Sequence, residues 1–244
     1  MKFQKQLLIV VFIPMIVFSQ SLNVYEKSGS VSNFALSEID SITFSEQSLF
    51  VCGTSQVTYG GISYNTVKVG SQCWLKENLN IGNRIQGSLN QTNNGTIEKY
   101  CYNNSDSNCD IYGGMYQWDE AMNYSTSGGK VQGICPEGWH LPTLAEYKTL
   151  IANVNNDGNA LKAIGQGTGN GIGTNASGFS ALLAGSKTTG GWFDYLGVLT
   201  FFWTSDNYST PNAKYVNLSG GNGNIDSDYN YDKIHGFSVR CIKD

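Results

Sequence analysis

Short stretches in which apolar and polar residues alternate dominate the second half of the chain and predict β-strands. Alternation over about four to eight residues places the apolar side chains on one face of a strand. Such stretches are FSALLAG (179–185), GWFDY (191–195), VLTFFWTS (198–205), KYVNLS (214–219) and GFSVRCIK (236–243). Nearer the start, apolar runs at 57–59 and 62–69 flank a Gly-Gly pair, which is typical of a tight hairpin turn. A second turn, at Gly70 and Ser71, leads into a further strand from Cys73.

Helical spacing of apolar residues is found in the middle of the chain. The stretch MYQWDEAM (115–122) places its apolar residues at intervals of three and four, which predicts a first helix. A second helix is predicted over about 144–154, because Thr143 and Glu146 have the spacing of a capping box. Residues 159–164 are expected to add another turn or two. Many strands and few helices indicate the α+β class.

The first fifty or so residues have a different pattern from the rest. Residues 1–19 combine a basic start with a short apolar run and predict a signal peptide that is cut between Ser19 and Gln20. Residues 20–50 predict a small β segment, a strand–turn–strand followed by a further short strand. The main domain is expected over 51–244, and no later stretch is apolar enough to span a bilayer.

Composition narrows the possible partners and the location. The net charge is −4 and only 14% of the residues are charged, with no basic patch along the chain. This balance argues against nucleic acid and against anionic membrane surfaces as partners. The signal peptide predicts an exported protein that is secreted, periplasmic or on the cell surface, with no membrane span after signal cleavage.

The six cysteines predict three disulfides. The chain has no C-x-x-C motif and no zinc-ligand spacing, and disulfides are the default for cysteines of an exported protein. Local geometry favours Cys101–Cys109, which would close a polar loop within the Asn-, Gly-, Ser- and Tyr-rich stretch 80–112, itself predicted as loop. The other four cysteines can pair in several ways, so spacing alone leaves their partners open.

No recognisable catalytic motif occurs in the chain. The motifs G-x-S-x-G and H-E-x-x-H are absent, and paired cysteines leave no thiolate nucleophile. His140 and His235 have no obvious carboxylate partner by spacing, and we expect His140, between Trp139 and Leu141, to be hydrogen-bonded and partly buried. We therefore expect no catalytic residues, with an enzyme whose groups assemble from distant positions as an alternative.

Two polar stretches resemble calcium loops in part. NVNNDGN (153–159) begins like an EF-hand loop, but Ile164 stands where the bidentate Glu is required, and Gly158 favours a helix end followed by a turn. DSDYNYD (226–232) places several oxygens on one side of an extended segment. We expect no cofactor and no metal ligands, with calcium left as an alternative.

Residues 203–235 have the composition of a binding surface. Tyrosine provides large contact area at little cost in rotamer entropy, and Asn and Ser provide adaptable hydrogen bonds. The same composition suits sugars, whose apolar faces stack on aromatic rings while their hydroxyls meet Asn and Asp. An Asn- and Gly-rich loop between two strands is the alternative. The candidate contact residues are Trp203, Asp206, Asn207, Tyr208, Tyr215, Asn217, Asp226, Asp228, Tyr229 and Tyr231.

Six stretches, read in order, resemble the Fibrobacter succinogenes major paralogous domain, a family of exported bacterial proteins. They lie within residues 57–244 and read YNTVKVGSQCWLKENLN, YGGMYQWDEAM, VQGICPEGWHLPTLAEYKTL, SGFSALLAG, FFWTSDNY and GFSVRCIKD. The segment WHLPTLAEY also resembles a segment of the formylglycine-generating enzymes and their relatives. Those proteins have a C-type-lectin-like fold.

The resemblance implies a C-type-lectin-like α+β architecture, with two helices packed on twisted antiparallel sheets and long ordered loops. In such a fold the last strand lies near the start of the second helix, which implies the pair Cys135–Cys241 and leaves Cys52–Cys73. The active-site cysteine pair of the formylglycine-generating enzymes and the lectin calcium motifs E-P-N and Q-P-D are not matched. Ligand contacts in this fold often precede the last strand, where 203–235 lies.

These observations favour an exported, non-catalytic recognition or adhesion module. Its expected partner is a glycan or protein on a cell surface or outside the cell, bound through the loop surface 203–235. One alternative is an enzyme of the formylglycine-generating type or another hydrolase. Another is a purely structural protein of the cell envelope.

Overall fold

The computed structural model describes residues 21–25, 29–39, 41, 49–127 and 129–244. The predicted signal peptide, residues 1–19, lies outside the described residues. The chain divides into two compact units, Met1–Leu49 and Phe50–Asp244, each of which is described by itself.

The first unit contains a small hairpin. Strands β1 (Ser21–Tyr25) and β2 (Val31–Ala35) pair antiparallel and are followed by a short 3-10 helix, η1 (Leu36–Glu38). The strand–turn–strand expected here is therefore present. Most of the further strand expected after it falls at residues that the structure does not describe.

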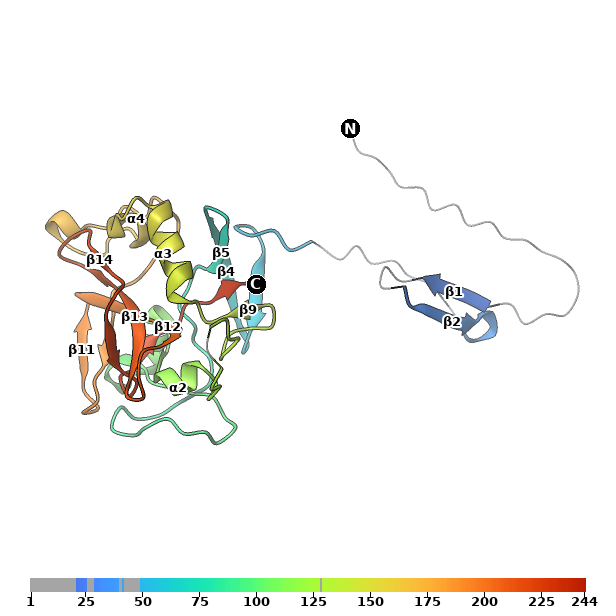
Figure 1. Cartoon of the computed structure of the whole chain (residues 1–244), viewed down its shortest axis with the longest axis horizontal. Helices are drawn as coiled ribbons and strands as arrows, with labels where there is room; N and C mark the ends of the chain where they lie inside the picture. The colour runs from blue at the N-terminus through green and yellow to red at the C-terminus, as the bar shows by residue number, and fades with distance from the viewer. Residues whose placement is uncertain (1–20, 26–28, 40, 42–48, 128) are drawn as a thin grey trace, which may run out of the picture. The chain divides into compact units, whose positions relative to one another are not determined.

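A mixed sheet of eight strands forms one half of the second unit. Its path runs β11-β10-β12-β13-β14, while β15 pairs with β13, β16 with β12, and β8 with β16. The strands are β8 (Met115–Tyr116), β10 (Ala184–Lys187), β11 (Phe193–Leu196), β12 (Leu199–Asn207), β13 (Asn212–Ser219), β14 (Ile225–Asp226), β15 (Asn230–Asp232) and β16 (Phe237–Ser238). The long strands β12 and β13 are antiparallel, and β11 forms one outer edge of the sheet (Figure 1).

A second sheet has five strands in the order β3-β4-β5-β17-β9. These strands are β3 (Gln56–Tyr59), β4 (Ile62–Val69), β5 (Gln72–Leu75), β9 (Trp139–His140) and β17 (Ile242–Lys243). The predicted β3–β4 hairpin is confirmed: Gly60 and Gly61 both have positive φ, 58° and 79°, as a two-residue turn of this kind requires. Strands β6 (Asn83–Arg84) and β7 (Glu98–Lys99) form a separate parallel pair.

Helix α3 (Leu144–Asn153) confirms the second predicted helix and its cap. The Thr143 hydroxyl accepts a hydrogen bond from the Glu146 backbone N–H, and the Glu146 carboxylate accepts one from the Thr143 backbone N–H. Two orphan donors of the first turn are thereby satisfied. The further turn expected at 159–164 is found slightly earlier, as α4 (Gly158–Leu161).

The first predicted helix is shorter than expected, and the predicted loop contains a helix. Helix α2 covers only Trp118–Ala121, because Met115 and Tyr116 form β8 and pair with β16 instead. Helix α1 (Asp106–Tyr112) lies within the stretch 80–112, preceded by the 3-10 helix η2 (Tyr102–Asn104). The Asn, Ser and Asp residues there have low helix propensity, so tertiary contacts override the local preference.

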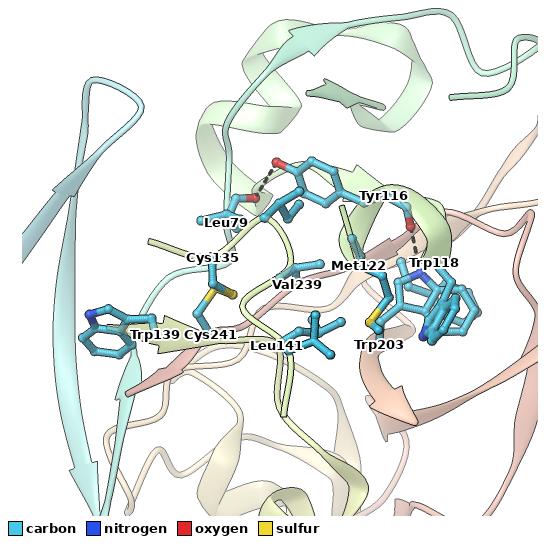
Figure 2. Packing of buried hydrophobic residues seen from close by; sticks show 14 of the residues in the cluster. Leu79, Tyr116, Trp118, Met122, Cys135, Trp139, Leu141, Trp203, Val239 and Cys241 are labelled. Atoms are coloured by element: carbon cyan, nitrogen blue, oxygen red, sulfur yellow. Dashed lines mark hydrogen bonds between the residues drawn. A yellow bond between two sulfur atoms is a disulfide. The ribbon is translucent and has the colours of Figure 1, made fainter. Parts of the chain in front are cut away.

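The second unit is therefore mixed α+β, with mostly strands and few helices, and two hydrophobic clusters lie beneath its sheets. One cluster gathers Trp118, Met122, Leu141, Trp203 and Val239 around the disulfide Cys135–Cys241 (Figure 2). In the other, side chains of α3 lie with Phe202 of β12 and with Val216 and Leu218 of β13. No helix among the described residues is both long enough and apolar enough to cross a membrane.

The six cysteines form the disulfides Cys52–Cys73, Cys101–Cys109 and Cys135–Cys241. The second is the pair that local spacing favours, and the other two are the pairs that the family resemblance implies. Each could stabilise the fold by a few kcal/mol, mainly by restricting the unfolded chain.

The buried cation Lys162 holds loops together through backbone carbonyls. The Lys162 ammonium donates to the carbonyls of Gly171, Ser219 and Asn222 at 2.5–2.8 Å. Since all three donors are satisfied, this lysine acts as a bridge between loops at one end of the large sheet.

Candidate functional site

An aromatic surface covers the face of the large sheet that points away from α3. Phe202 and Val216, which are paired across β12 and β13, belong to the cluster around α3. Because side chains alternate along a strand, the neighbours Phe201 and Tyr215 point to the opposite face. There they contact aromatic rings from other elements. We define the aromatic face as Tyr195, Phe201, Tyr215, Tyr231, His235 and Phe237.

The rings of the aromatic face pack in a continuous series. Phe201 lies 6.2 Å from Tyr195, 5.9 Å from Tyr215 and 4.7 Å from Phe237, measured between ring centroids. Tyr231 lies 5.8 Å from both Tyr215 and Phe237. Aromatic pairs at these distances attract each other beyond their burial, so these rings hold one another in place.

Two rings of the aromatic face, Tyr195 and Tyr231, are exposed to solvent. Phe201, Tyr215 and Phe237 are buried and form a floor, whereas Tyr195 is 52% exposed and Tyr231 is 42% exposed. These two tyrosines border a small cavity of about 100 Å³, which Asp194 and His235 also line. The cavity is too small for a whole ligand but offers an apolar notch with polar groups at its rim.

Polar side chains stand beside these rings. Asn217 and Asp226 face each other across β13 and β14, on the same side of the sheet as Tyr215. Neither side chain has a hydrogen-bond partner within the described part of the chain. Burial, together with nearby Asp226, Tyr231 and Tyr229, raises the pKa of Tyr215 to about 12, so its hydroxyl stays neutral and can donate.

His235 is held at the edge of the aromatic face. Its Nδ1 lies 3.2 Å from the Asp232 carbonyl, which can only accept, so this nitrogen carries the proton of that hydrogen bond. Burial lowers the pKa of His235 below its usual value. The ring is thus kept neutral near pH 7, with Nε2 left as an acceptor.

Two of the sequence-predicted contacts are part of the core. Trp203 has no exposed surface and Tyr215 is 7% exposed. The Trp203 indole N–H donates to the Tyr116 carbonyl at 2.8 Å (Figure 2). Trp203 is therefore not accessible to a ligand, contrary to the expectation. Tyr215 is almost fully buried and packs against the more exposed Tyr231.

Four other predicted contacts lie away from the aromatic face. Asp206 caps α3, where its Oδ2 accepts from the Leu144 N–H at 2.5 Å. Asn207 borders a separate cavity of about 470 Å³. Tyr208 and Asp228 are on the α3 side of the sheet: both contact Lys214, and Asp228 also pairs with Lys148 at 2.8 Å. The segment 203–235 is therefore divided between two faces of one sheet.

His140 has two carboxylate partners, contrary to the expectation from spacing. Its Nε2 lies 2.8 Å from Glu146 and its Nδ1 lies 2.7 Å from Asp244. The ring is 2% exposed, so neither nitrogen is available to a substrate. The prediction of a hydrogen-bonded, structural histidine is confirmed, while its partners come from elements that sequence spacing could not bring together.

Arg240 borders a separate cavity of about 390 Å³. Its guanidinium donates to Asn78 and to the carbonyls of Lys76 and Phe179. Burial lowers its pKa to about 10, so it remains charged at neutral pH. These hydrogen bonds join the segment at the end of β5 to the segment before β10, so Arg240 has a structural role.

The two calcium-like stretches have other partners. Asp157 caps α4 by accepting from the Asn159 N–H at 2.9 Å. Asp228 is paired with a lysine, as described above. Among the described residues, no group of three or more His, Cys, Asp or Glu side chains is placed to hold a metal ion.

The contacts predicted from the sequence do not include Trp192, Asp194 or Tyr195, which are exposed in β11 or directly before it. The pattern of GWFDY predicts a strand but not an exposed surface. The available signal is that three aromatic residues follow directly on two glycines.

Comparison with known proteins places the chain in a family. No match was found among curated proteins, and none among solved structures. The model of the Fibrobacter succinogenes major domain matches residues 67–243, which include both sheets apart from β3 and the first part of β4. The chain therefore belongs to the Fibrobacter succinogenes major domain family.

Proposed function

We propose that this protein is an exported, non-catalytic recognition or adhesion module that binds glycan or protein through its aromatic face. The observation that carries the proposal is the exposure of Tyr195 and Tyr231 above a floor of buried rings, with the exposed Tyr229 close to Tyr215. Exposed tyrosines on a rigid support are the usual anchors of binding surfaces, because little conformational entropy is lost when they are covered.

The polar groups around the rings suit such a ligand. Asn217 and Asp226 can exchange hydrogen bonds with hydroxyl or amide groups that lie across the tyrosines. Because the rings and the strands below them are already packed, binding would order few further groups. A C-type-lectin-like architecture, in which contacts precede the last strand, fits this position and is part of the proposal.

The non-catalytic part of the proposal is supported by the state of the nucleophiles and bases. The six cysteines are all in disulfides, and both ring nitrogens of His140 are occupied. Export is supported by the predicted signal peptide and by the three disulfides, which persist in oxidising compartments. An enzyme and a purely structural envelope protein are the competing functions.

A glycan and host-protein array with the purified mature protein tests the proposal. We expect capture of at least one ligand, and a loss of about tenfold or more when Tyr229→Ala and Tyr231→Ala are combined. The matched control is Tyr208→Ala, because Tyr208 is 58% exposed and Tyr229 is 60% exposed, but Tyr208 lies on the other side of the sheet. Capture that the double variant leaves unchanged, or that Tyr208→Ala abolishes, would contradict the assignment of the aromatic face.

A further inference from the structure

A second surface feature lies at the outer edge of the large sheet, on the turn that leads into β11. The Trp192 side chain is 76% exposed there and borders an open groove of about 680 Å³. Ser88, Asn103, Asn104 and Asp194 also line this groove. An indole exposed to this degree presents a large flat apolar ring to solvent, with an N–H donor at its edge.

The walls of the groove are tied to one another by hydrogen bonds and ring packing. The Tyr102 hydroxyl donates to the Phe193 carbonyl at 3.2 Å, and the two rings lie 5.5 Å apart. On the neighbouring wall, the Gly87 N–H donates to the Asn104 side-chain oxygen at 2.8 Å. Three segments that are distant in sequence therefore form one preassembled surface.

Glycine allows two of these segments to meet. A Cβ added at Gly87 would lie 2.6 Å from the Gly191 carbonyl oxygen, and one added at Gly191 would lie 2.9 Å from the Gly87 oxygen. Gly191 also has a φ of +86°, which other residues rarely adopt. The turn is closed by the Thr188 N–H, which donates to the Trp192 carbonyl at 2.8 Å.

The third wall, η2, is fixed by a covalent bond. The disulfide Cys101–Cys109 closes the segment that carries Asn103 and Asn104, both with positive φ. The Asn103 side chain is exposed and has no hydrogen-bond partner within the described residues, and the same holds for the Asp194 carboxylate. Unpaired polar groups thus stand beside the indole on a rigid support.

The chemistry of the groove selects among ligands. A flat indole beside amide, hydroxyl and carboxylate groups matches a sugar ring, which is apolar on one face and polar around its edge. Asp194 is the only charged residue among those that line the groove, and no lysine or arginine is present there. A uronic acid or sulfated sugar would therefore meet repulsion without compensation.

We propose that this groove binds a neutral hexopyranose unit, with the sugar ring stacked on Trp192 and its hydroxyls hydrogen-bonded to Asn103 and Asp194. The site is distinct from the aromatic face, because Trp192 and Asn103 do not border that surface. Asp194 lines both, so the two sites adjoin at β11. The inference stands whether the aromatic face binds a glycan or a protein.

Tryptophan fluorescence reads this site directly. Of the five tryptophans, Trp74, Trp118, Trp139 and Trp203 are at most 6% exposed, so the long-wavelength emission comes from Trp192. The mature protein is titrated with neutral hexaoses of glucose, mannose and N-acetylglucosamine, and with a uronic-acid hexaose. We expect a saturable blue shift with at least one neutral hexopyranose oligomer and none with the uronic acid.

Variants and controls complete the experiment. Binding to the variants is measured by isothermal titration calorimetry, because replacing Trp192 removes the fluorescent reporter. Trp192→Ala should weaken binding about tenfold or more, and Trp192→Phe should retain part of it, whereas Ile164→Ala, another exposed apolar change, should have no effect. The combined Tyr229→Ala and Tyr231→Ala variant should keep this binding, which separates the site from the aromatic face.

The proposal is overturned by any of three results. The first is a panel in which no neutral sugar shifts the emission. The second is binding that Trp192→Ala leaves intact. The third is a blue shift that depends on protein concentration alone and coincides with dimerisation in sedimentation velocity, since Trp192 would then be covered by a second copy of the chain.

Discussion

Glu146 shows how much a single side chain can link. Its Oε2 accepts hydrogen bonds from the Thr143 backbone N–H at 2.8 Å and from the Thr143 hydroxyl at 2.9 Å, while its Oε1 contacts His140. Burial raises the pKa of this carboxyl, but the hydrogen bonds from His140 and Thr143 outweigh burial, so the pKa lies below its usual 4.5. The folded protein therefore favours the charged form.

This shift gives a pH dependence of stability with a definite sign. Because the folded pKa is lower than the unfolded one, Glu146 contributes stability above about pH 4.5 that is lost as the pH falls through the folded value. Glu146→Gln should lower the free energy of unfolding by about 1–2 kcal/mol at pH 6, mainly through the cap and the His140 contact. Urea unfolding at pH 6 and pH 3 checks this, and an equal difference at both values would contradict it.

At the scale of elements, features that depend on neighbouring residues could be predicted from the sequence. Which side chains of a strand are buried could not. The α3 cap and the Gly60–Gly61 turn depend on residues adjacent in sequence, and both were found from the sequence. Strand β12 is apolar on both faces, so its pattern could not reveal that Trp203 would be buried. Nor could composition show that 203–235 divides between two faces of a sheet, because this depends on strand register.

Helix α1 is the element whose stability depends most clearly on a crosslink. Its polar residues favour a helix weakly, and the disulfide Cys101–Cys109 joins it to η2. Replacing both cysteines with serine should cost about 2–3 kcal/mol, the value expected for so short a loop. Hydrogen exchange should accelerate in 102–112 more than in α3. Uniform acceleration across the domain would show that α1 is not a separate unit of stability.

At the scale of the whole molecule, the two sheets of the second unit have different roles. The five-stranded sheet, with Cys135–Cys241 and the His140 contacts, holds the segments near β17 in place. The eight-stranded sheet offers its aromatic face and its β11 edge to solvent. The family and the α+β class could be predicted from motifs, whereas the proposed binding surface could be defined only from the register of β12, β13 and β15.

The most direct test of the recognition function is a tyrosine footprint with the ligand captured on the array. Nitration followed by peptide mass spectrometry compares the exposed residues Tyr195, Tyr229 and Tyr231 with Tyr208, which is equally accessible but on the opposite side. We predict that the ligand protects the first three several-fold and leaves Tyr208 reactive. Protection of Tyr208 alone, or of none of the four, would contradict the claim that the aromatic face is the binding surface.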